Sequence, residues 1–309
     1  MAEKILIAPL HWGLGHAARC IPLIRKELDR GNEVLIAAND GPEALLHAHF
    51  PELEVVEIPF MVITYPADGN MMRHFFWRGP KFLWNIWKEH AHLKTLIKKH
   101  QITKVISDGR FGLWNRSVFS VFVHHQIEIK TPRFQGLVNW LNRWVMNQYD
   151  EVWIPDFNKK PGLAGELSHP AKMPKRFLYI GPLSRFQAPL SKTGKWVWDA
   201  VAIVSGPEPQ RSLFEVDVVR RYLESGQRLL LLRGKPHETD EKNLDNIKIV
   251  NHLNDHELYQ ALSQAKKVIS RSGYSTIMDF YVLGVNEVEW HPTPGQTEQE
   301  YLAKLHSEK

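Results

Sequence analysis

The chain has 309 residues, 43% of them hydrophobic, which is enough apolar side chain to build the cores of two ordinary domains and excludes a disordered segment. The net charge of +5 suits an anionic ligand or an acidic membrane surface, but it is too small to indicate nucleic-acid binding. One cysteine and the lack of any run of 18 apolar residues exclude a disulfide framework, a cysteine metal cluster and a membrane span, and predict a cytoplasmic protein.

The first half of the chain alternates short apolar runs, which indicate buried strands, with helical segments. The runs are KILIAPL, EVLIAA, LEVVEIP, TKVIS, SVFVHH and EVWIP. This alternation predicts βαβ units and a parallel sheet. The loops after the strands then share one edge of the sheet, where open α/β sheets bind their ligands.

The second half repeats the alternation with VWDAVAIVS, RLLLLR, NIKIV, KKVIS and VNEVEW. A stretch rich in Pro, Gly, Ser and Lys separates the halves, and it contains one more predicted strand, FLYIG, followed by a linker near residues 184–195. The sequence therefore predicts two α/β domains, residues 1–185 and residues 196–309.

The segment APLHWGLGHAARC follows the first predicted strand and has two interpretations. Gly13, Gly15 and Ala18 match the G-x-G-x-x-G/A pattern of dinucleotide-binding folds, and Asp40 follows the second strand, where such folds place an acidic residue. However, APLHW separates the strand from the first glycine, whereas a dinucleotide fold turns there almost at once. In the other interpretation the glycines let a ligand approach the backbone, and His16 opens a helix whose dipole keeps its ring neutral and able to accept a proton.

Two later strand ends carry polar side chains that a parallel sheet would bring to the same edge. Asp108 ends one strand, and His124 and His125 end the next. Asp108 could fix the tautomer of His16 and stabilise its charged form. Alternatively, Asp108 could only cap the turn that follows it, and His16 could only cap its helix. Because alternate strand residues point to opposite faces, the histidine pair is not expected to bind a metal. We predict His16 and Asp108 as catalytic residues, and Gly13, Gly15, His124 and His125 as acceptor-side residues.

Three loops of the second half follow predicted strands and open predicted helices. They are SGPEPQRS, SRSGYSTIMD and HPTPGQTEQEY. Three helix N-termini at one sheet edge offer free amides to a diphosphate, and Arg271 adds positive charge in place of a metal, for which the sequence has no Asp-x-Asp pair. Taken singly, each loop is also consistent with an ordinary connection between a strand and a helix.

Two of these loops resemble a known family. SRSGYSTIMDFYVLG followed by HPTPGQTEQEYLA is similar in order and spacing to the nucleotide-sugar signature of glycosyltransferase family 28, and HWGLGHAAR is similar to that family's N-terminal glycine turn with histidine. The resemblance implies the α/β GT-B fold, in which two Rossmann-like parallel-sheet domains face a cleft. It also implies a metal-independent, inverting transfer from a nucleoside-diphosphate sugar, with UDP favoured, to a hydroxyl acceptor, with no further cofactor.

The resemblance implies roles for individual residues as well. Asp279 would bind the ribose hydroxyls, and Gln296 and Gln299 would contact the donor sugar. His16 falls on the family's N-terminal histidine, which is a base or a group that orients the acceptor. The resemblance also implies that Ser272, Gly273 and Thr276 would lie at the diphosphate. The other predicted donor-binding residues of the three loops are Ser205, Gly206, Arg211 and Arg271.

Aromatic segments give a weaker signal for the acceptor. MRHFFWRGPKFLWNIWKEH interleaves aromatic and basic residues, and Trp140 and Trp144 lie four apart on one predicted helix. Such surfaces enter the headgroup region of anionic membranes, which predicts a protein peripheral to the inner face of the membrane and an acceptor linked to a lipid or the cell envelope. A buried aromatic core is the competing interpretation.

Two further functions remain open. The chain ends ten residues after Gln299, where the resembled family usually continues, so a shortened second domain is expected. A nucleotide-sugar epimerase or hydrolase would use the same donor site without an acceptor, and a noncatalytic relative would bind the nucleotide sugar alone. The expected partners are a nucleotide-sugar donor and an unknown acceptor, and not nucleic acid.

Overall fold

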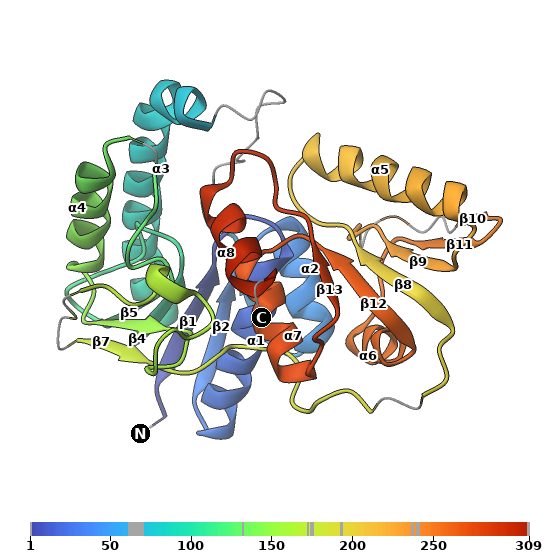
Figure 1. The fold of residues 1–309 in the computed structure, drawn as a ribbon. Helices are drawn as coiled ribbons and strands as arrows, with labels where there is room; N and C mark the ends of the chain where they lie inside the picture. Colours follow the sequence, from blue (N-terminus) through green and yellow to red (C-terminus); the bar gives the residue numbers. More distant parts are fainter. Residues whose placement is uncertain are drawn as a thin grey trace. The chain divides into compact units, whose positions relative to one another are not determined.

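The computed structural model describes residues 2–60, 71–131, 133–171, 173, 176–191, 194–235, 238 and 242–307, apart from the side chains of residues 71–80 and 242. These side chains include the first part of the aromatic segment discussed above. The chain divides into two compact units, of which the first runs to Ser184 and the second starts from Arg185. Both are α/β units with one sheet each (Figure 1).

Unit 1 contains a seven-stranded parallel sheet in the order β3-β2-β1-β4-β5-β6-β7. The order reverses at the centre, because the chain moves outward from β1 in one direction and from β4 in the other. Such a reversal is the switch point at which open sheets bind ligands. The strands are β1 (Lys4–Pro9), β2 (Glu33–Ala37), β3 (Val55–Val56), β4 (Lys104–Asp108), β5 (Phe119–Val123), β6 (Glu151–Ile154) and β7 (Phe177–Tyr179).

Alternate residues of β1 are buried on opposite faces of this sheet. Leu6 and Ala8 pack in one cluster with Leu93 and Leu96 of α3, while the residues between them are buried on the other face. The helix α1 contacts both β1 and β2. The helices of unit 1 are α1 (Leu14–Asp29), α2 (Asp40–His49), α3 (Met71–His100) and α4 (Gln135–Met146), with a short 3-10 turn, η1 (Gly165–Leu167).

Unit 2 has a six-stranded sheet in the order β10-β11-β9-β8-β12-β13, parallel except for the antiparallel pair β10 and β11. Its order reverses between β8 and β12. The strand β10 was not predicted, because Lys-Asn-Leu carries no apolar run. The strands are β8 (Trp198–Ile203), β9 (Leu229–Leu232), β10 (Lys242–Leu244), β11 (Ile247–Val250), β12 (Ala265–Ser270) and β13 (Val288–Trp290).

Helices cover both faces of the second sheet. Phe214 and Val218 of α5 pack against Ala200 and Ala202 of β8, and the cluster on the other face takes side chains from α6 and α7. The helices of unit 2 are α5 (Gln210–Ser225), α6 (Asp255–Ser263), α7 (Tyr274–Leu283) and α8 (Thr297–Ser307). None of the helices in the described part of the chain is long and apolar enough to cross a bilayer.

Candidate functional site

The first candidate site lies at the switch point of unit 1, where the loop after β1 meets the end of β4. His16 stands in the first turn of α1, and Asp108 is the last residue of β4. Nδ1 of His16 is 3.1 Å from Oδ2 of Asp108. The Asp108 side chain is fully buried, whereas 19% of the His16 side chain is exposed and accessible to a ligand. The structure thus brings together the two residues that we predicted as a base and its partner.

Arg19 completes this cluster and was not predicted. It follows His16 by three residues on α1, and its Nε lies 2.8 Å from both carboxylate oxygens of Asp108. Its Nη2 lies 2.5 Å from Oδ1 of Asp108 and 2.8 Å from Nδ1 of His16. Because residues three apart are neighbours on a helix, the sequence did contain a signal for Arg19.

The charges of the cluster favour a neutral ring beside an ionised carboxylate. Burial and then the Arg19 guanidinium lower the pKa of His16, while Asp108 opposes them. Burial alone would raise the pKa of Asp108, but Arg19 and His16 lower it to about 2. A neutral imidazole next to a carboxylate is able to accept a proton near pH 7.

Glycines shape the backbone around His16. Gly13 caps α1 with a φ of 73°, and Gly109, directly after Asp108, has a φ of 75°. A Cβ added at Gly109 would lie 3.0 Å from Cε1 of His16. Gly109, which was not predicted as a site residue, is therefore required both by its backbone conformation and by its closeness to the ring. Gly15 lies in the first turn of α1, one residue before His16.

His124 and His125 follow β5, whose last residue, Val123, pairs with Asp108 of β4. The His124 ring packs 5.1 Å from the Phe122 ring. Both ring nitrogens of His124 are buried without a hydrogen-bond partner among the residues that the structure describes. Burial, His125 and Arg19 hold the pKa of His124 well below its usual value, so this ring is uncharged. The pair lies at the predicted sheet edge and influences the His16 cluster electrostatically.

A second candidate site lies at the carboxyl edge of unit 2. The strands β8, β12 and β13 are adjacent and parallel, and the helices α5, α7 and α8 follow them. The N-cap residues of α5 and α7 are Pro209 and Gly273. At the start of α5 the backbone N–H of Arg211 donates to the carbonyl of Pro207 at 3.1 Å, and that of Ser212 donates to the Glu208 carboxylate at 3.2 Å. An anion bound at this helix start would have to compete with these two contacts. Ser205, Thr276 and Gln296 lie half-buried on the same three segments.

Arg271 connects the loops of this edge. Its Nη1 donates to the carbonyls of His291 and Pro292, at 3.1 and 3.0 Å, and its Nη2 donates to the carbonyl of Gln210 at 2.8 Å. The guanidinium also lies 4.3 Å from the ring centre of Phe214. Burial lowers the pKa of Arg271 to about 10, and no carboxylate is among its contacts in the described parts of the chain. Arg271 therefore places an uncompensated positive charge beneath the loops.

Ser272 and Gln299 connect the other two loops. Oγ of Ser272 donates to the backbone carbonyl of Gln299 at 2.7 Å, and the backbone N–H of Thr293 donates to Oε1 of Gln299 at 2.8 Å. The Gln299 Nε2 group has no hydrogen-bond partner within the described ranges, so it is free to donate to a ligand. Gly206, in the loop after β8, has a φ of 105°. A Cβ added to this glycine would lie 3.8 Å from Oγ1 of Thr293.

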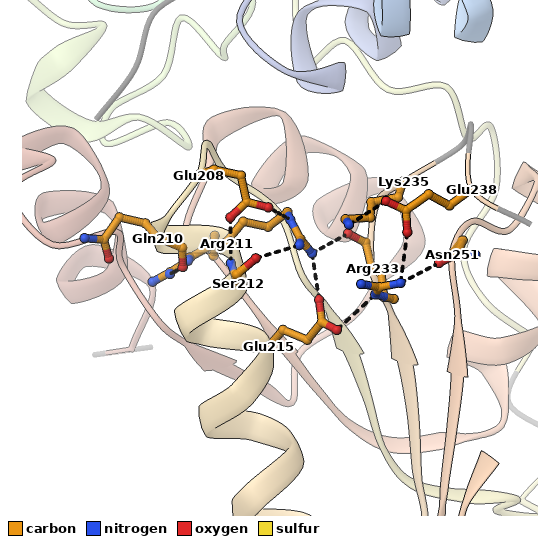
Figure 2. A network of polar contacts seen from close by, with 10 residues as sticks. Glu208, Gln210, Arg211, Ser212, Glu215, Arg233, Lys235, Glu238 and Asn251 are labelled. Atoms are coloured by element: carbon orange, nitrogen blue, oxygen red, sulfur yellow. Dashed lines mark hydrogen bonds and ion pairs between the residues drawn. The ribbon is translucent and has the colours of Figure 1, made fainter. Parts of the chain in front are cut away.

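Two predicted donor-binding residues form ion pairs instead of lying open to a ligand. Figure 2 shows Arg211 between Glu208 and Glu215, at 2.7 and 2.8 Å. The network continues through Glu215 to Arg233, at 2.9 Å. Asp279 lies 3.5 Å from Arg185, which also pairs with Asp255 of α6 at 3.0 Å. A donor that used Arg211 or Asp279 would have to compete with these contacts.

Comparisons with known proteins agree with this architecture. No protein-family model matches the sequence. A curated protein of Methanosarcina acetivorans, described as an uncharacterized glycosyltransferase, is 23% identical over 340 residues that cover 99% of this chain and 84% of that protein.

Solved structures of glycosyltransferases are also similar to this chain. Arabidopsis thaliana UGT89C1, solved in complex with UDP-L-rhamnose, is 13% identical, with coverage of 99% and 84% of the two chains and a TM-score of 0.64. The kitacinnamycin glycosyltransferase is 16% identical, with coverage of 98% and 84% and a TM-score of 0.63. MurG of Acinetobacter baumannii is 12% identical, with coverage of 99% and 83% and a TM-score of 0.51. The predicted GT-B fold is confirmed, and so is the predicted resemblance to glycosyltransferases.

Proposed function

We propose that this chain, which has the GT-B fold of the glycosyltransferases, is a metal-independent inverting enzyme that moves a sugar from a nucleoside-diphosphate sugar to a hydroxyl acceptor. The observation that carries the proposal is the neutral, partly exposed His16 held beside the buried carboxylate of Asp108. In the transfer, His16 takes the acceptor proton while the acceptor oxygen forms a bond to the anomeric carbon. The bond from that carbon to the diphosphate breaks on the opposite side, and the nucleoside diphosphate leaves.

The donor is assigned to the carboxyl edge of unit 2. The loops that open α5, α7 and α8 would bind the diphosphate near the positive ends of the helix dipoles, and the buried charge of Arg271 would stabilise the leaving group where other enzymes use a metal. The unused Nε2 group of Gln299 donates to a sugar hydroxyl. Ribose binding by Asp279 requires that the donor displace Arg185 from Asp279. We propose UDP as the nucleotide because of the family resemblance.

The donor site is tested by ligand-induced stabilisation of the full chain. The thermal stability of the protein is measured in the presence of UDP, TDP, GDP, CDP, ADP or NAD, and every sample contains EDTA. A ligand at 100 times its Kd stabilises the folded protein by about 2.7 kcal/mol, and we expect this with UDP. Stabilisation by NAD alone would assign Gly13 and Gly15 to a dinucleotide instead. Stabilisation that disappears in EDTA would contradict the metal-independent site.

The catalytic assignment is tested with His16→Ala. Release of UDP from UDP-sugars, with phenolic and sugar acceptors, is expected to fall by about 100-fold or more, since a positioned base contributes about that much. Binding of UDP should stay unchanged, because His16 and the diphosphate site belong to different units. The matched control is His47→Ala, an exposed histidine of α2. Wild-type turnover in the His16 variant would remove His16 from the mechanism, and donor cleavage or epimerisation without any acceptor would favour the alternative enzymes.

For the acceptor, we propose one that is linked to a lipid at an anionic membrane on the cytoplasmic side. Side chains on α4 are exposed at positions i, i+3, i+4 and i+7, which places them on one helix face. These residues are Leu137 (57% exposed), Trp140 (58%), Leu141 (47%) and Trp144 (54%). On α3, the exposed rings of Trp84 and Trp87 stack 4.8 Å apart, with Lys88 over Trp84. Exposed aromatic side chains next to basic residues suit the headgroup region of such a membrane.

A further inference from the structure

Nδ1 of His16 lies within hydrogen-bonding distance of two groups with opposite requirements. Nη2 of Arg19, 2.8 Å away, can only donate, so it requires a lone pair on Nδ1. Oδ2 of the ionised Asp108, 3.1 Å away, can only accept, so it requires a proton on Nδ1. One ring nitrogen cannot satisfy both groups at the same time.

The contacts of Arg19 favour the lone pair. Its Nε and one N–H of Nη2 already bind Asp108, at 2.8 and 2.5 Å, which leaves the second N–H of Nη2 for the ring of His16. The contact from Nη2 to the ring is also shorter than the contact from the ring to Asp108. The ring occupies the space that a side chain at position 109 would take, since a Cβ added to Gly109 would lie 3.0 Å from Cε1.

We infer that Arg19 is a positioning residue that sets the tautomer of His16, holding Nδ1 as an acceptor so that the ring proton lies on Nε2 in the resting protein. The catalytic meaning of this inference rests on the proposed function. A ring with its proton on Nε2 can donate to a ligand but cannot take an acceptor proton at that atom. Before transfer, the ring must release the Nε2 proton to solvent and take one up on Nδ1, facing Asp108, and the contact from Nη2 must open.

Arg19 also influences the charge of the ring. The titratable and charged groups that act on His16 come from three segments: Arg19 on α1, Asp108 at the end of β4, and the two histidines after β5. Cys20 on α1 interacts with Asp108 and Arg19. Among them Arg19 disfavours the imidazolium and Asp108 favours it. Loss of the guanidinium would therefore raise the pKa of His16, whereas a purely structural role of Arg19 would leave that pKa unchanged.

The test is the tautomer of His16, read from two-bond ¹H–¹⁵N NMR spectra of the full-length protein and assigned by the signals lost in His16→Gln. In the wild type at pH 8 we expect the proton on Nε2. Arg19→Lys keeps a positive charge beside Asp108 but lacks the planar fork, so the proton should move to Nδ1. Arg19→Met should in addition raise the pKa of His16 above that of the wild type, because the guanidinium that disfavours the imidazolium is lost.

The controls separate this inference from stability and from activity. Arg30→Lys, at the C-cap residue of α1 and paired with Glu27, should leave the His16 spectrum unchanged. Arg19→Met removes the buried guanidinium that pairs with Asp108, so if this variant does not fold, the wild type and Arg19→Lys still decide the question. A proton on Nδ1 in the wild type, or identical spectra for the wild type and Arg19→Lys, would overturn the inference. Because these spectra need no turnover, the expected tautomers in a protein without transferase activity would contradict only the proposed function.

Discussion

Gly109 sets one limit on where the His16 ring can lie. Its φ of 75° belongs to the left-handed region, and the ring of His16 fills the space that a side chain would take. Gly31 offers a matched comparison within the same unit, since its φ is 77° and an added Cβ would have no described atom within 4 Å. A substitution at Gly31 would therefore show the effect of backbone strain alone, and a substitution at Gly109 would show backbone strain together with displacement of the His16 ring.

We predict that Gly109→Ala and Gly31→Ala both lower the free energy of unfolding by about 1–2 kcal/mol, the cost of a left-handed conformation at a residue with a Cβ. Only Gly109→Ala should also shift the His16 signals in NMR spectra and reduce turnover. The measurements are urea unfolding and the spectra of the two variants. Equal effects on the His16 signals would show that contact with Gly109 does not position the ring.

Asp108 predicts a dependence of stability on acid. Its folded pKa of about 2 lies below the ordinary value of 3.8, so its stabilisation is complete above that ordinary value and is lost as the pH falls toward 2. The difference in unfolding free energy between the wild type and Asp108→Asn should shrink by roughly 2 kcal/mol between pH 5 and pH 2. A constant difference for Asp108→Asn would mean that its pKa is not lowered.

Some residues of the candidate site could be predicted from the sequence and others could not. His16 and Asp108 follow from the rule that parallel strands end at one edge, and the structure aligns Pro9 with Asp108. Gly109 could not be predicted, because its role depends on the position of the ring. The partners of Arg211 lie three residues before and four residues after it, a helical spacing visible in the sequence. The contact between Asp279 and Arg185 could not be predicted, because it spans most of the second half of the chain.

At the level of elements, Arg110 joins α3 to the loop that follows β4. Its Nη2 lies 3.0 Å from Oε1 of Glu89, and its other contacts are the carbonyls of Pro9 and Pro59. Both charged side chains are almost completely buried. Removal of one partner leaves a buried charge without compensation, which is far more costly than loss of an exposed pair.

We predict that Arg110→Met lowers the free energy of unfolding by about 3–5 kcal/mol. Burial raises the pKa of Glu89, so the loss should be smaller at pH 5, where the unpaired carboxyl takes up a proton, than at pH 8. Arg143→Met, which breaks the exposed pair with Glu128, should cost about 1 kcal/mol or less. Equal losses for the two variants in urea unfolding at both pH values would contradict this account.

The exposed face of α4 predicts membrane binding. The wild type should sediment with vesicles of anionic phosphatidylglycerol and stay in the supernatant with neutral phosphatidylcholine, and Trp140→Ser with Trp144→Ser should lower its recovery with the anionic vesicles several-fold. The control is Leu213→Ser with Val216→Ser, at two exposed apolar positions of α5. Equal recovery of the wild type with both kinds of vesicle, or no effect of the tryptophan variant, would refute membrane binding by α4.

Most strands could be predicted because their apolar runs are buried on both faces, which leaves a continuous signal in the sequence. The exception, β10, pairs on one side only and lies at the edge of its sheet, so its residues need not be apolar. Helical spacing alone does not show which face of a helix is covered, so the sequence does not decide whether Trp140 and Trp144 lie in the core or at the surface. The structure exposes both.

For the whole molecule, the alternation of strands and helices was enough to predict two Rossmann-like sheets, and the fold comparisons confirm this. Each sheet reverses its order beside the strand that starts its unit, β1 or β8. The predicted catalytic and donor residues follow from this repeated rule. Partners that are distant in sequence, such as Arg185 as the partner of Asp279, depend on side-chain packing that the alternation does not encode.

The confinement of each candidate site to one unit makes the protein modular. His16, Arg19 and Asp108 come from unit 1 alone, and the three loops around Arg271 come from unit 2 alone. Under the proposed function, donor recognition could therefore diverge among relatives without disturbing His16, and changes around His16 need not alter the choice of nucleotide. We expect a chimera that joins this chain, up to Ser184, to the second half of a relative to take its nucleotide preference from the relative and the His16 cluster from this chain.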